Sequence, residues 1–346
     1  MLDSRERLGS LDKRGMLSTI EQMPKNLSEG VRLGTRMSLL RFSPSKVVVC
    51  GMGGSAIGGD LLCEWVSSIS EVPCSVHRSY SVPSHIDKDS LVIVASYSGD
   101  TEETLNMFEA AQKKGARIVA IASGGELAHS AEKLGIPCAK IPTGMMPRAS
   151  LGFMMGAMIG ILERTQMVSS GEQVEETVRV LKSVIDSCKP SVKTADNPAK
   201  RLAHELMGHV PVVVGYGLSR PVAKRWANQL NENAKSLAFS SEIPELDHNE
   251  IVGWMKDGLS RGFAAVILDN EQGNSALSRR VEATKNMLTR VASVHRVKSL
   301  GRGPLAQMFS LVLVGDYVSV YLGILRGEDP SANEPIDELK SVLAKK

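Results

Sequence analysis

One short pattern occurs twice in this chain, and it restricts the possible folds more than any other feature. Residues 48–55 (VVCGMGGS) and residues 213–219 (VVGYGLS) both run from valines into Gly-x-Gly-x-Ser. A buried strand that leads into glycines is typical of α/β proteins, where glycines let the chain turn tightly into the next helix. The two copies lie 215 − 51 = 164 residues apart. We therefore expect one α/β unit to occur twice.

Short β-rich segments alternate with helical segments along both halves of the chain, as in proteins built from βαβ units. The valine-rich runs at residues 47–49 and 92–94 are apolar without alternation, which is typical of strands buried on both faces. We predict an α/β protein with two doubly wound parallel sheets and flanking helices. The expected strands are residues 46–50, 74–77, 91–96, 116–122, 210–215, 262–268 and 291–297.

The length of 346 residues fits two domains, since domains average about 150 residues. We expect the first domain at residues 1–168, beginning with an amphipathic helix at residues 9–28. Residues 169–200 are polar and charged, and we expect them to form a connector. The second domain is expected at residues 201–346, including a C-terminal tail.

The composition excludes several classes of partner. With 41 Lys and Arg against 38 Asp and Glu, the net charge of +3 is too small to attract nucleic acid or a membrane surface. The apolar run at residues 151–162 is too short to span a membrane, and the run at residues 308–325 is interrupted by Asp316. The shorter run also predicts a close contact between two helices, because glycines recur in it every four residues, at Gly152, Gly156 and Gly160.

The cysteines and the N-terminal residues indicate a cellular compartment. The five cysteines are widely spread, and none has Cys-x-x-Cys spacing, so we expect reduced core residues rather than a zinc or redox site. The histidines show no metal-binding spacing, so no metal is expected. Charges occupy the N-terminal segment where an export signal has an apolar run. We therefore expect a cytoplasmic protein.

The first glycine cluster, residues 51–60, lies between an expected strand and an expected helix. Glycines let the backbone approach an anion, and the free N–H groups of a helix start attract it. The same residues match G-x-G-x-x-A, a dinucleotide-binding pattern, but the next strand ends in His77 and Arg78 without the carboxylate that binds the NAD ribose. An anion site, a dinucleotide site and a turn that only packs all remain open from this cluster alone.

A second cluster, residues 96–104, follows another buried strand and begins another helix. It places three hydroxyl groups at one strand end, those of Ser96, Ser98 and Thr101, and hydroxyls with free N–H groups are suitable neutral ligands for phosphate. Helix capping explains one hydroxyl but not three. Because both clusters follow strands of one sheet, they are expected at the same edge, where α/β folds bind ligands. Together they predict a phosphomonoester site.

Three further residues are candidates for chemistry. Arg148 begins a long apolar helix near the same sheet edge, where a guanidinium can stabilise an oxyanion, although most such arginines are ordinary surface residues. Arg225, Gln229 and Glu232 lie at i, i+4 and i+7, on one face of a helix, where polar partners could surround Glu232. A solvated helix face is the ordinary interpretation of such a glutamate. His248 lies between two polar residues, where a turn histidine without a role is the ordinary interpretation.

In their order along the chain, these motifs resemble the bifunctional phosphoglucose/phosphomannose isomerases of the sugar isomerase (SIS) superfamily. The matching residues are Gly53-Gly54-Ser55, residues 96–101, Pro147-Arg148, residues 231–235 and His248-Asn249. The match spans nearly the whole chain, and the spacing of 248 − 232 = 16 residues between the glutamate and the histidine is similar to this family's catalytic pair. The resemblance implies two SIS domains in a homodimer, with the histidine contributed by the neighbouring subunit.

The resemblance also implies the role of each matching residue. Glu232 would move a proton between C1 and C2, Arg148 would stabilise the enediolate, and His248 would help to open the sugar ring. The lysine that this family carries near the C-terminus matches Lys340, and the bifunctional members have threonine seven residues earlier, where this chain has Asn333. The residues expected to bind the sugar phosphate are Gly53, Gly54, Ser55, Ser96, Ser98, Thr101 and Asn333.

The implied reaction interconverts fructose 6-phosphate with glucose 6-phosphate, and with mannose 6-phosphate, without a cofactor. It needs one base that takes and returns a proton, and a group that holds the oxyanion formed between the two steps. A non-catalytic sugar-phosphate-binding regulatory protein is the main alternative, because it would need the two loops but neither Glu232 nor His248. A nicotinamide-dependent oxidoreductase is a third hypothesis and rests on the G-x-G-x-x-A pattern alone.

Overall fold

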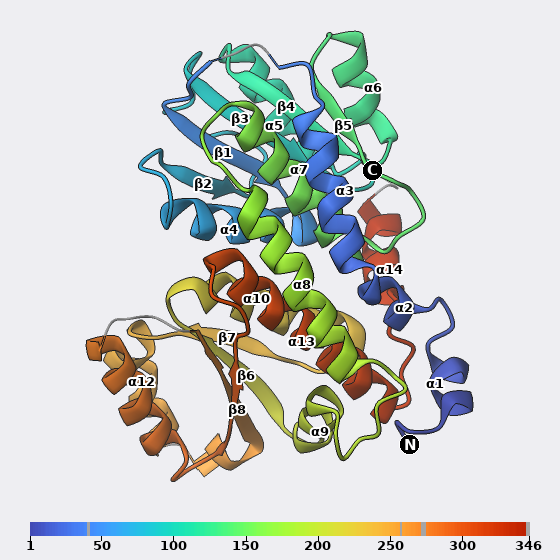
Figure 1. The fold of residues 1–346 in the computed structure, drawn as a ribbon, viewed down its shortest axis with the longest axis vertical. Helices are drawn as coiled ribbons and strands as arrows, with labels where there is room; N and C mark the ends of the chain where they lie inside the picture. The colour runs from blue at the N-terminus through green and yellow to red at the C-terminus, as the bar shows by residue number, and fades with distance from the viewer. Residues whose placement is uncertain (40–41, 257, 271–274, 344–346) are drawn as a thin grey trace. The chain divides into compact units, whose positions relative to one another are not determined.

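The structure is a computed structural model that describes residues 1–39, 42–256, 258–270 and 275–343 (Figure 1). The chain forms two compact units. Residues 22–182 and 300–310 form the first-sheet unit, and residues 1–21, 183–299 and 311–346 form the second-sheet unit.

The first-sheet unit alternates strands and helices, as expected from the sequence. Its elements are α3 (Met23–Thr35), β1 (Lys46–Gly51), α4 (Gly53–Ser67), β2 (Cys74–His77), β3 (Ser90–Ala95), α5 (Glu102–Lys113), β4 (Arg117–Ala122), α6 (Gly125–Lys133), β5 (Cys138–Lys140), a 3₁₀ turn η1 (Pro147–Ala149) and α7 (Leu151–Arg164). Two long helices, α8 (Gly171–Cys188) and α13 (Pro304–Leu325), contribute residues to both units.

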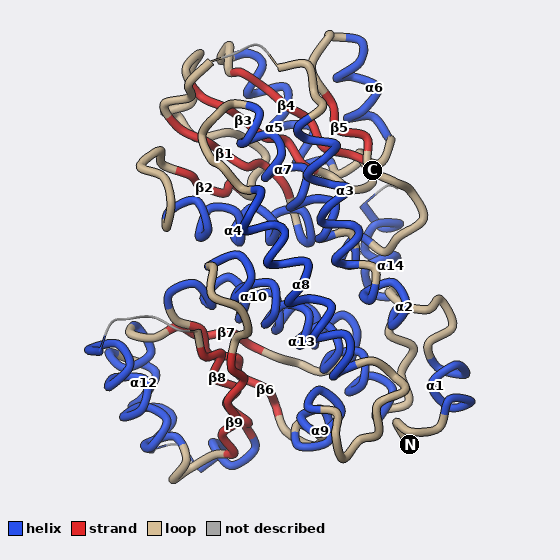
Figure 2. Tube along the Cα trace, viewed as in Figure 1, coloured by secondary structure: helices blue, strands red, loops and turns tan. Residues whose placement is uncertain are grey.

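The second-sheet unit repeats this alternation, and Figure 2 distinguishes its strands from its helices and loops. Its elements are α1 (Arg5–Leu11), α2 (Met16–Glu21), α9 (Pro198–Glu205), β6 (Val210–Gly215), η2 (Gly217–Ser219), α10 (Arg220–Ala234), β7 (Phe239–Glu242), η3 (Glu245–His248), α11 (Glu250–Lys256), η4 (Gly258–Gly262), β8 (Phe263–Asp269), α12 (Ser275–Leu288), β9 (Ser293–Lys298) and α14 (Glu334–Leu343).

Both sheets are parallel, and the first four strands of each have the same order. The first sheet has the strand order β2-β1-β3-β4-β5, and the second has β7-β6-β8-β9, so the first strand of each unit lies between the second and the third. The strand order therefore reverses between β1 and β3, and again between β6 and β8. Such a switch point is where doubly wound sheets bind ligands. The predicted α/β class and the predicted repeat of one unit are confirmed.

The central strands of the first sheet are buried on both faces, which explains their unbroken valine runs. Val48 and Cys50 belong to a core cluster that includes Met107 and Phe108 of α5. The side chain of Val49 points the other way, toward α4, where a Cβ on Gly59 would lie 2.8 Å from it. Apolar residues at consecutive positions therefore contact helices on opposite faces of the sheet.

Helix α7 packs on α3 through facing glycines, which confirms the predicted close helix contact. A Cβ on Gly156 would lie 2.5 Å from the Leu27 carbonyl oxygen, and one on Gly160 would lie 2.2 Å from the Val31 carbonyl oxygen. Gly34 on α3 is equally close to the backbone of α7. The two helix backbones are therefore in direct contact, and a single methyl group would separate them.

Replacing Gly160 by alanine is expected to destabilise the protein by about 1–3 kcal/mol, because the new methyl group has no space and the helices must move apart. Gly9 is the matched control, since it lies within helix α1 and a Cβ there meets no atom within 4 Å. Gly9→Ala is expected to stabilise the protein by up to about 1 kcal/mol through helix propensity alone. Thermal unfolding of both variants measures these effects. A Gly160→Ala variant as stable as the parent would contradict the close packing.

The expected amphipathic helix at residues 9–28 is instead three helices, α1, α2 and α3. Asp12 ends the first and begins the second, because its carboxylate accepts hydrogen bonds from the Met16 and Leu17 amides at 2.6 and 2.9 Å. Gly15 allows the tight turn between them with φ of +66°. The apolar spacing alone predicts one continuous helix. The Asp12 side chain interrupts it, because it caps the start of the second helix.

The segment expected as a polar connector, residues 169–200, largely forms helix α8. Its buried residues recur at helical spacing, at Val174, Thr177, Leu181, Val184 and Cys188. The cysteine expectation also needs correction. Cys63 and Cys74 form a disulfide, whereas Cys50, Cys138 and Cys188 are free.

Candidate active site

The two predicted phosphate loops follow β1 and β3, the adjacent strands at the switch point of the first sheet. Gly51 pairs with Ala95 in the register of these strands, so the residues that follow each strand start side by side. The first loop turns directly into α4 at Gly53, and the second turns into α5 after Thr101. Two helix N-termini therefore begin beside one sheet edge, as a phosphate site requires.

The glycines of the first loop are needed because backbone approaches backbone. A Cβ on Gly51 would lie 2.7 Å from the Ala95 carbonyl oxygen, so a side chain there would push β1 from the second loop. Gly53 has a φ of +50°, which glycine adopts without strain. A Cβ on Gly54 would lie 3.1 Å from the Pro147 carbonyl oxygen and 3.4 Å from the Arg148 Cα. The loop therefore borders the turn that carries Arg148.

Two of the three hydroxyls of the second loop, those of Ser96 and Thr101, are hydrogen-bonded to each other. Ser96 is 3% exposed, and its Oγ donates a hydrogen bond to Thr101 Oγ1 at 3.1 Å while it accepts one from the Gly99 amide at 3.1 Å. Ser98 is exposed, and its Oγ accepts from the Asp100 amide at 3.3 Å. Thr101 is the N-cap residue of α5. The bonds to Gly99 and Asp100 order this loop, and the Thr101 hydroxyl stands at the start of a helix.

Tyr97 and Asp100 belong to the predicted second loop and hold it in place through contacts that the sequence does not predict. The Tyr97 hydroxyl accepts a hydrogen bond from the Met145 amide at 2.8 Å and so joins the loop to the segment that precedes Arg148. Burial raises the pKa of Tyr97, which keeps this hydroxyl protonated. Asp100 Oδ1 accepts from the Glu126 amide at 2.9 Å and so anchors the loop to the start of α6. Arg148 itself is buried, with 3% exposure.

Glu232 lies near the end of α10, a helix that polar contacts fasten to α13. Both oxygens of Asp316 accept hydrogen bonds from Arg225, at 2.9 and 2.8 Å, and Gln229 Nε2 donates to the same carboxylate at 2.9 Å. One turn further, Asn233 Nδ2 donates to Ser319 Oγ at 3.0 Å. These side chains are buried and Glu232 is half-buried at the edge of their face.

Burial raises the pKa of Asp316, and the Arg225 guanidinium opposes that rise. The sequence predicts that Arg225, Gln229 and Glu232 lie on one helical face. The structure adds that the first two hold the helix, so the position of Glu232 depends on a buried ion pair.

Lys235 ends the same helix and links it to the C-terminal segment. It adopts the left-handed conformation with φ of +49°, which is uncommon for a residue with a side chain. Its Nζ donates to the Glu232 carbonyl oxygen at 3.0 Å and to the Asp329 carbonyl oxygen at 2.5 Å. Asn333 follows four residues after Asp329. Its carbonyl oxygen accepts a hydrogen bond from the Ile336 amide at 2.9 Å, in the first turn of α14. Lys340 is exposed on α14.

His248 is the last residue of the 3₁₀ turn η3, and its side chain is exposed. The polar residues on either side support the turn. Asp247 accepts hydrogen bonds from Thr284 Oγ1 at 2.7 Å and from Arg280 at 3.2 Å. Asn249 Nδ2 donates to Glu245 Oε1 at 2.6 Å. His248 is therefore presented at the surface of the second-sheet unit by a turn that other side chains stabilise.

The structure thus brings together only part of the predicted site. Within the first-sheet unit, the glycine loop borders both the second loop and the turn of Arg148. The other predicted residues belong to the second-sheet unit, on separate elements. These residues are Glu232, His248, Asn333 and Lys340.

The corresponding loop of the second sheet is closed by its own side chains. The Ser219 hydroxyl donates to the Leu268 carbonyl oxygen at 2.8 Å, and Asn270 Nδ2 donates to the Tyr216 carbonyl oxygen at 2.7 Å. The Tyr216 hydroxyl donates to Asp269 Oδ1 at 2.7 Å. The sequence predicts that this copy does not hold the ligand of the first copy in the same way. These contacts agree, because they occupy the donors at that strand end.

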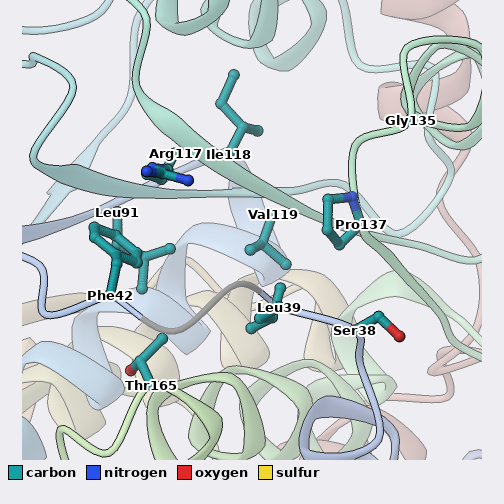
Figure 3. Close-up of a pocket in the computed structure, with 10 residues that line it drawn as sticks. All are labelled: Ser38, Leu39, Phe42, Leu91, Arg117, Ile118, Val119, Gly135, Pro137 and Thr165. Atoms are coloured by element: carbon teal, nitrogen blue, oxygen red, sulfur yellow. The ribbon is translucent and has the colours of Figure 1, made fainter.

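The first-sheet unit also has a cavity of about 210 Å³ at the opposite ends of its strands (Figure 3). Leu91 near the start of β3 and Arg117 at the start of β4 line it, together with Phe42. The Arg117 guanidinium lies 5.3 Å from the centre of the Phe42 ring, so this side of the cavity is formed by a cation–π contact. The amino ends of the strands lie far along the sheet from the phosphate loops, so this cavity is separate from the predicted site.

Two further expectations concern metals and membranes. Among the described residues, no three His, Cys, Asp or Glu side chains gather as a metal site. Helix α13 is long and apolar enough to cross a membrane, but 89% of its apolar window is buried within the protein, as in a core helix. Its one charged residue, Asp316, is paired with Arg225.

The doubly wound sheets and the loops at their switch point define the class of protein. The model of the SIS domain matches residues 41–145, and the model described as bacterial phospho-glucose isomerase C-terminal SIS domain matches residues 195–343. The chain is thus a protein with two SIS domains. A solved structure of a hypothetical protein from Thermus thermophilus shares the fold, with a TM-score of 0.74 at 17% identity over 99% of this chain and 92% of that chain.

Curated relatives give the family within this class. The chain is 38% identical to a bifunctional phosphoglucose/phosphomannose isomerase of Caldicellulosiruptor bescii, over 95% of this chain and 99% of that protein. It is 35% identical to the protein of the same name from Aquifex aeolicus, over 86% of this chain and 90% of that protein. The chain belongs to the bifunctional phosphoglucose/phosphomannose isomerase family.

Proposed function

We propose that this protein is an aldose–ketose isomerase that interconverts fructose 6-phosphate with glucose 6-phosphate and with mannose 6-phosphate. The observation that carries the proposal is the pair of loops at the β1–β3 switch point, in a chain of this family. The phosphate would be bound by residues of both loops, which are Gly53, Gly54, Ser55, Ser96, Ser98 and Thr101. Their backbone N–H groups and hydroxyls supply hydrogen bonds, and the two helix starts supply positive potential.

The remaining residues would perform the chemistry. Glu232 takes the proton from the carbon next to the carbonyl and returns it to the adjacent carbon, while the sugar passes through an enediolate. Arg148 stabilises the negative charge of that enediolate, and one such group contributes about 3 kcal/mol. His248 and Lys340 assist ring opening and proton movement at the sugar oxygens. Atoms balance without a cofactor, because the proton that leaves one carbon is added to the other.

We also propose that the protein is a cytoplasmic homodimer in which His248 serves the neighbouring subunit. His248 is exposed, and apolar side chains close to it in the chain are exposed as well: Val252 by 63% and Leu259 by 72%. Leu259 borders a hollow of about 380 Å³ that Trp254 and Phe239 also line. An exposed apolar surface beside a histidine in a stable turn suits a contact with a second copy.

Turnover by the purified protein tests the proposal. Fructose 6-phosphate is supplied in D₂O, and the products are followed by NMR or by a coupled assay. We expect both glucose 6-phosphate and mannose 6-phosphate to form. The two sugars arise from a common enediolate and differ only in the face of C2 to which the proton is added. Binding of fructose 6-phosphate without turnover would instead identify the regulatory alternative. Stabilisation by NAD but not by sugar phosphate would favour the oxidoreductase.

Mixing two inactive variants tests the shared histidine. His248→Gln and Glu232→Gln are each expected to lose most activity as homodimers. When subunits exchange at random, half of the dimers contain one of each, and one of their two sites has both intact residues. Activity is then expected to recover to about a quarter of the wild-type value. If mixed dimers form and remain inactive, His248 acts within its own subunit and the proposed sharing is wrong.

Asn333 is expected to affect the choice between the two aldose products. At this position the resemblance to the bifunctional members of the family predicts threonine. Replacing Asn333 by threonine changes the shape and hydrogen bonding of this position without altering charge. We expect the ratio of mannose 6-phosphate to glucose 6-phosphate turnover to change by about threefold to tenfold, equivalent to about 1 kcal/mol. An unchanged ratio would show that Asn333 has no part in this choice.

A further inference from the structure

We propose that Cys63 and Cys74 form an oxidation site that fastens the phosphate-binding helix α4 to the edge strand β2. Cys63 lies on α4 and Cys74 is the first residue of β2, with their Cα atoms 5.0 Å apart. Both side chains are half-buried, so small reagents reach them, whereas Cys50 and Cys188 are buried. The inference rests on the proposed function only for its effect on substrate binding.

The disulfide is one of several contacts along the same face of α4. Asp60, one turn before Cys63, forms an ion pair with Arg78, the residue that follows β2. Gly59 packs so closely on the sheet that a Cβ there would lie 2.8 Å from Val49. The helix is therefore attached to β2 at both ends of that strand, by the ion pair at one end and by the disulfide at the other.

These attachments matter because the first turn of α4 is the first phosphate loop. The loop residues, Gly53 to Ser55, precede Asp60 and Cys63 on one continuous helix of 15 residues. Strand β2 lies at the edge of the sheet and pairs with β1 alone among the described strands. A covalent link from α4 to this strand limits the movement of the helix and orders the loop before the phosphate arrives.

The chemical step is thiol–disulfide exchange with a low-molecular-weight disulfide such as oxidised glutathione. The thiolate of one cysteine attacks the reagent, and the first small thiol leaves. The thiolate of the other cysteine then attacks the mixed disulfide and releases the second small thiol. The protein loses two protons and two electrons, and the reagent takes up both. A dithiol reductant reverses the step, so the link is reversible.

The first experiment measures the site itself, without any reference to activity. The protein is equilibrated with oxidised glutathione, denatured, alkylated and weighed by mass spectrometry. We expect three alkylated cysteines after oxidation and five after reduction, as two cysteines are paired of the five in the chain. Cys63→Ser and Cys74→Ser should each lose the internal disulfide, and any remaining change should be a mixed disulfide that adds the mass of one glutathione. Cys138→Ser, a half-buried control, should still form the internal disulfide. Five alkylated cysteines after oxidation would overturn the proposal.

The second experiment measures the consequence in the unmodified chain, oxidised and reduced. Hydrogen exchange of the α4 amides is expected to slow on oxidation. The unfolding midpoint is expected to rise by about 5–10 °C, because the link lowers the conformational entropy of the unfolded chain. The KM for fructose 6-phosphate is expected to fall by about threefold, with kcat nearly unchanged.

The two proposals fail in different ways. If the disulfide forms and α4 is protected but fructose 6-phosphate neither binds nor reacts, the proposed function is wrong and the oxidation site stands. If the protein turns over fructose 6-phosphate with the same KM in both redox states, the link does not act on the phosphate loop and the inference is overturned. Cys138→Ser, tested in parallel, should respond to oxidation as the parent does.

Discussion

Glu232→Gln is expected to lower kcat for fructose 6-phosphate by about 10²–10⁴-fold, because an amide cannot accept the proton that the reaction moves. The KM should change little, since the phosphate loops belong to the first-sheet unit and Glu232 to the second. Glutamine preserves the size of the side chain, and Glu232 is only half-buried, so we expect the variant to fold as the parent does. Coupled assays in both directions measure the effect.

A second readout separates loss of the base from damage to the site. In D₂O, the parent should incorporate deuterium next to the carbonyl, and Glu232→Gln should lose this exchange together with turnover. Glu6→Gln is a suitable control, as Glu6 is an exposed glutamate in α1 of the same unit. Equal turnover rates for the parent and Glu232→Gln would remove Glu232 from the role of base.

The central strands could be predicted from the sequence because burial on both faces requires unbroken apolar runs. Two edge strands, β2 and β9, could also be predicted, at residues 74–77 and 291–297, whereas the edge strands β5 and β7 could not. Strand β5 (Cys138–Lys140) has three residues and β7 (Phe239–Glu242) has four, and both contain polar residues because one side of an edge strand faces solvent. Neither has the length or the alternation that distinguishes a strand from a loop. Their existence follows only from the pairing with the neighbouring strand.

Helix α8 is hidden in the sequence by its own charges. It carries five Glu, Lys or Arg residues between Gly171 and Ser183, which is typical of a solvated connector. Its buried side chains nevertheless recur every three or four residues, at Val174, Thr177 and Leu181. An amphipathic helix has many charges on one face, so periodicity is the better guide than composition in such a segment.

Some features of the candidate site could be predicted from the sequence, and others could not. Gly54 and Ser96 could be found from sequence because each sits in a glycine- or hydroxyl-rich motif directly after a strand. Tyr97 and Lys235 also lie within matching motifs, but their contacts could not be predicted, because their partners, the Met145 amide and the Asp329 carbonyl, are far away in the chain. Contacts to backbone atoms leave no pattern in a single sequence, since a residue of any type supplies the same backbone partner. The pairing of Cys63 with Cys74 could not be predicted either, because the spacing of the two cysteines matches no known motif.

Breaking the buried ion pair on the helix that carries Glu232 should strongly destabilise its unit. Asp316→Ala is expected to destabilise the protein by about 3–5 kcal/mol, because Arg225 would lose its carboxylate partner while remaining 1% exposed. Gln229 would lose its hydrogen-bond acceptor at the same time. Urea unfolding measures the stability, and kcat should fall as well, because the helix that carries Glu232 loses its attachment to α13.

The double variant Arg225→Met with Asp316→Leu tests whether charge or packing decides. It removes both charges together and keeps side chains of comparable size, so its stability is expected to lie close to that of the parent and above that of Asp316→Ala. Removing Asp316 alone is costly because the Arg225 charge stays buried without that carboxylate, whereas the double variant leaves neither charge. If the double variant is as unstable as Asp316→Ala, the ion pair itself supplies the stability. If Asp316→Ala costs less than about 1 kcal/mol, water reaches Arg225 and the pair does not fix the position of Glu232.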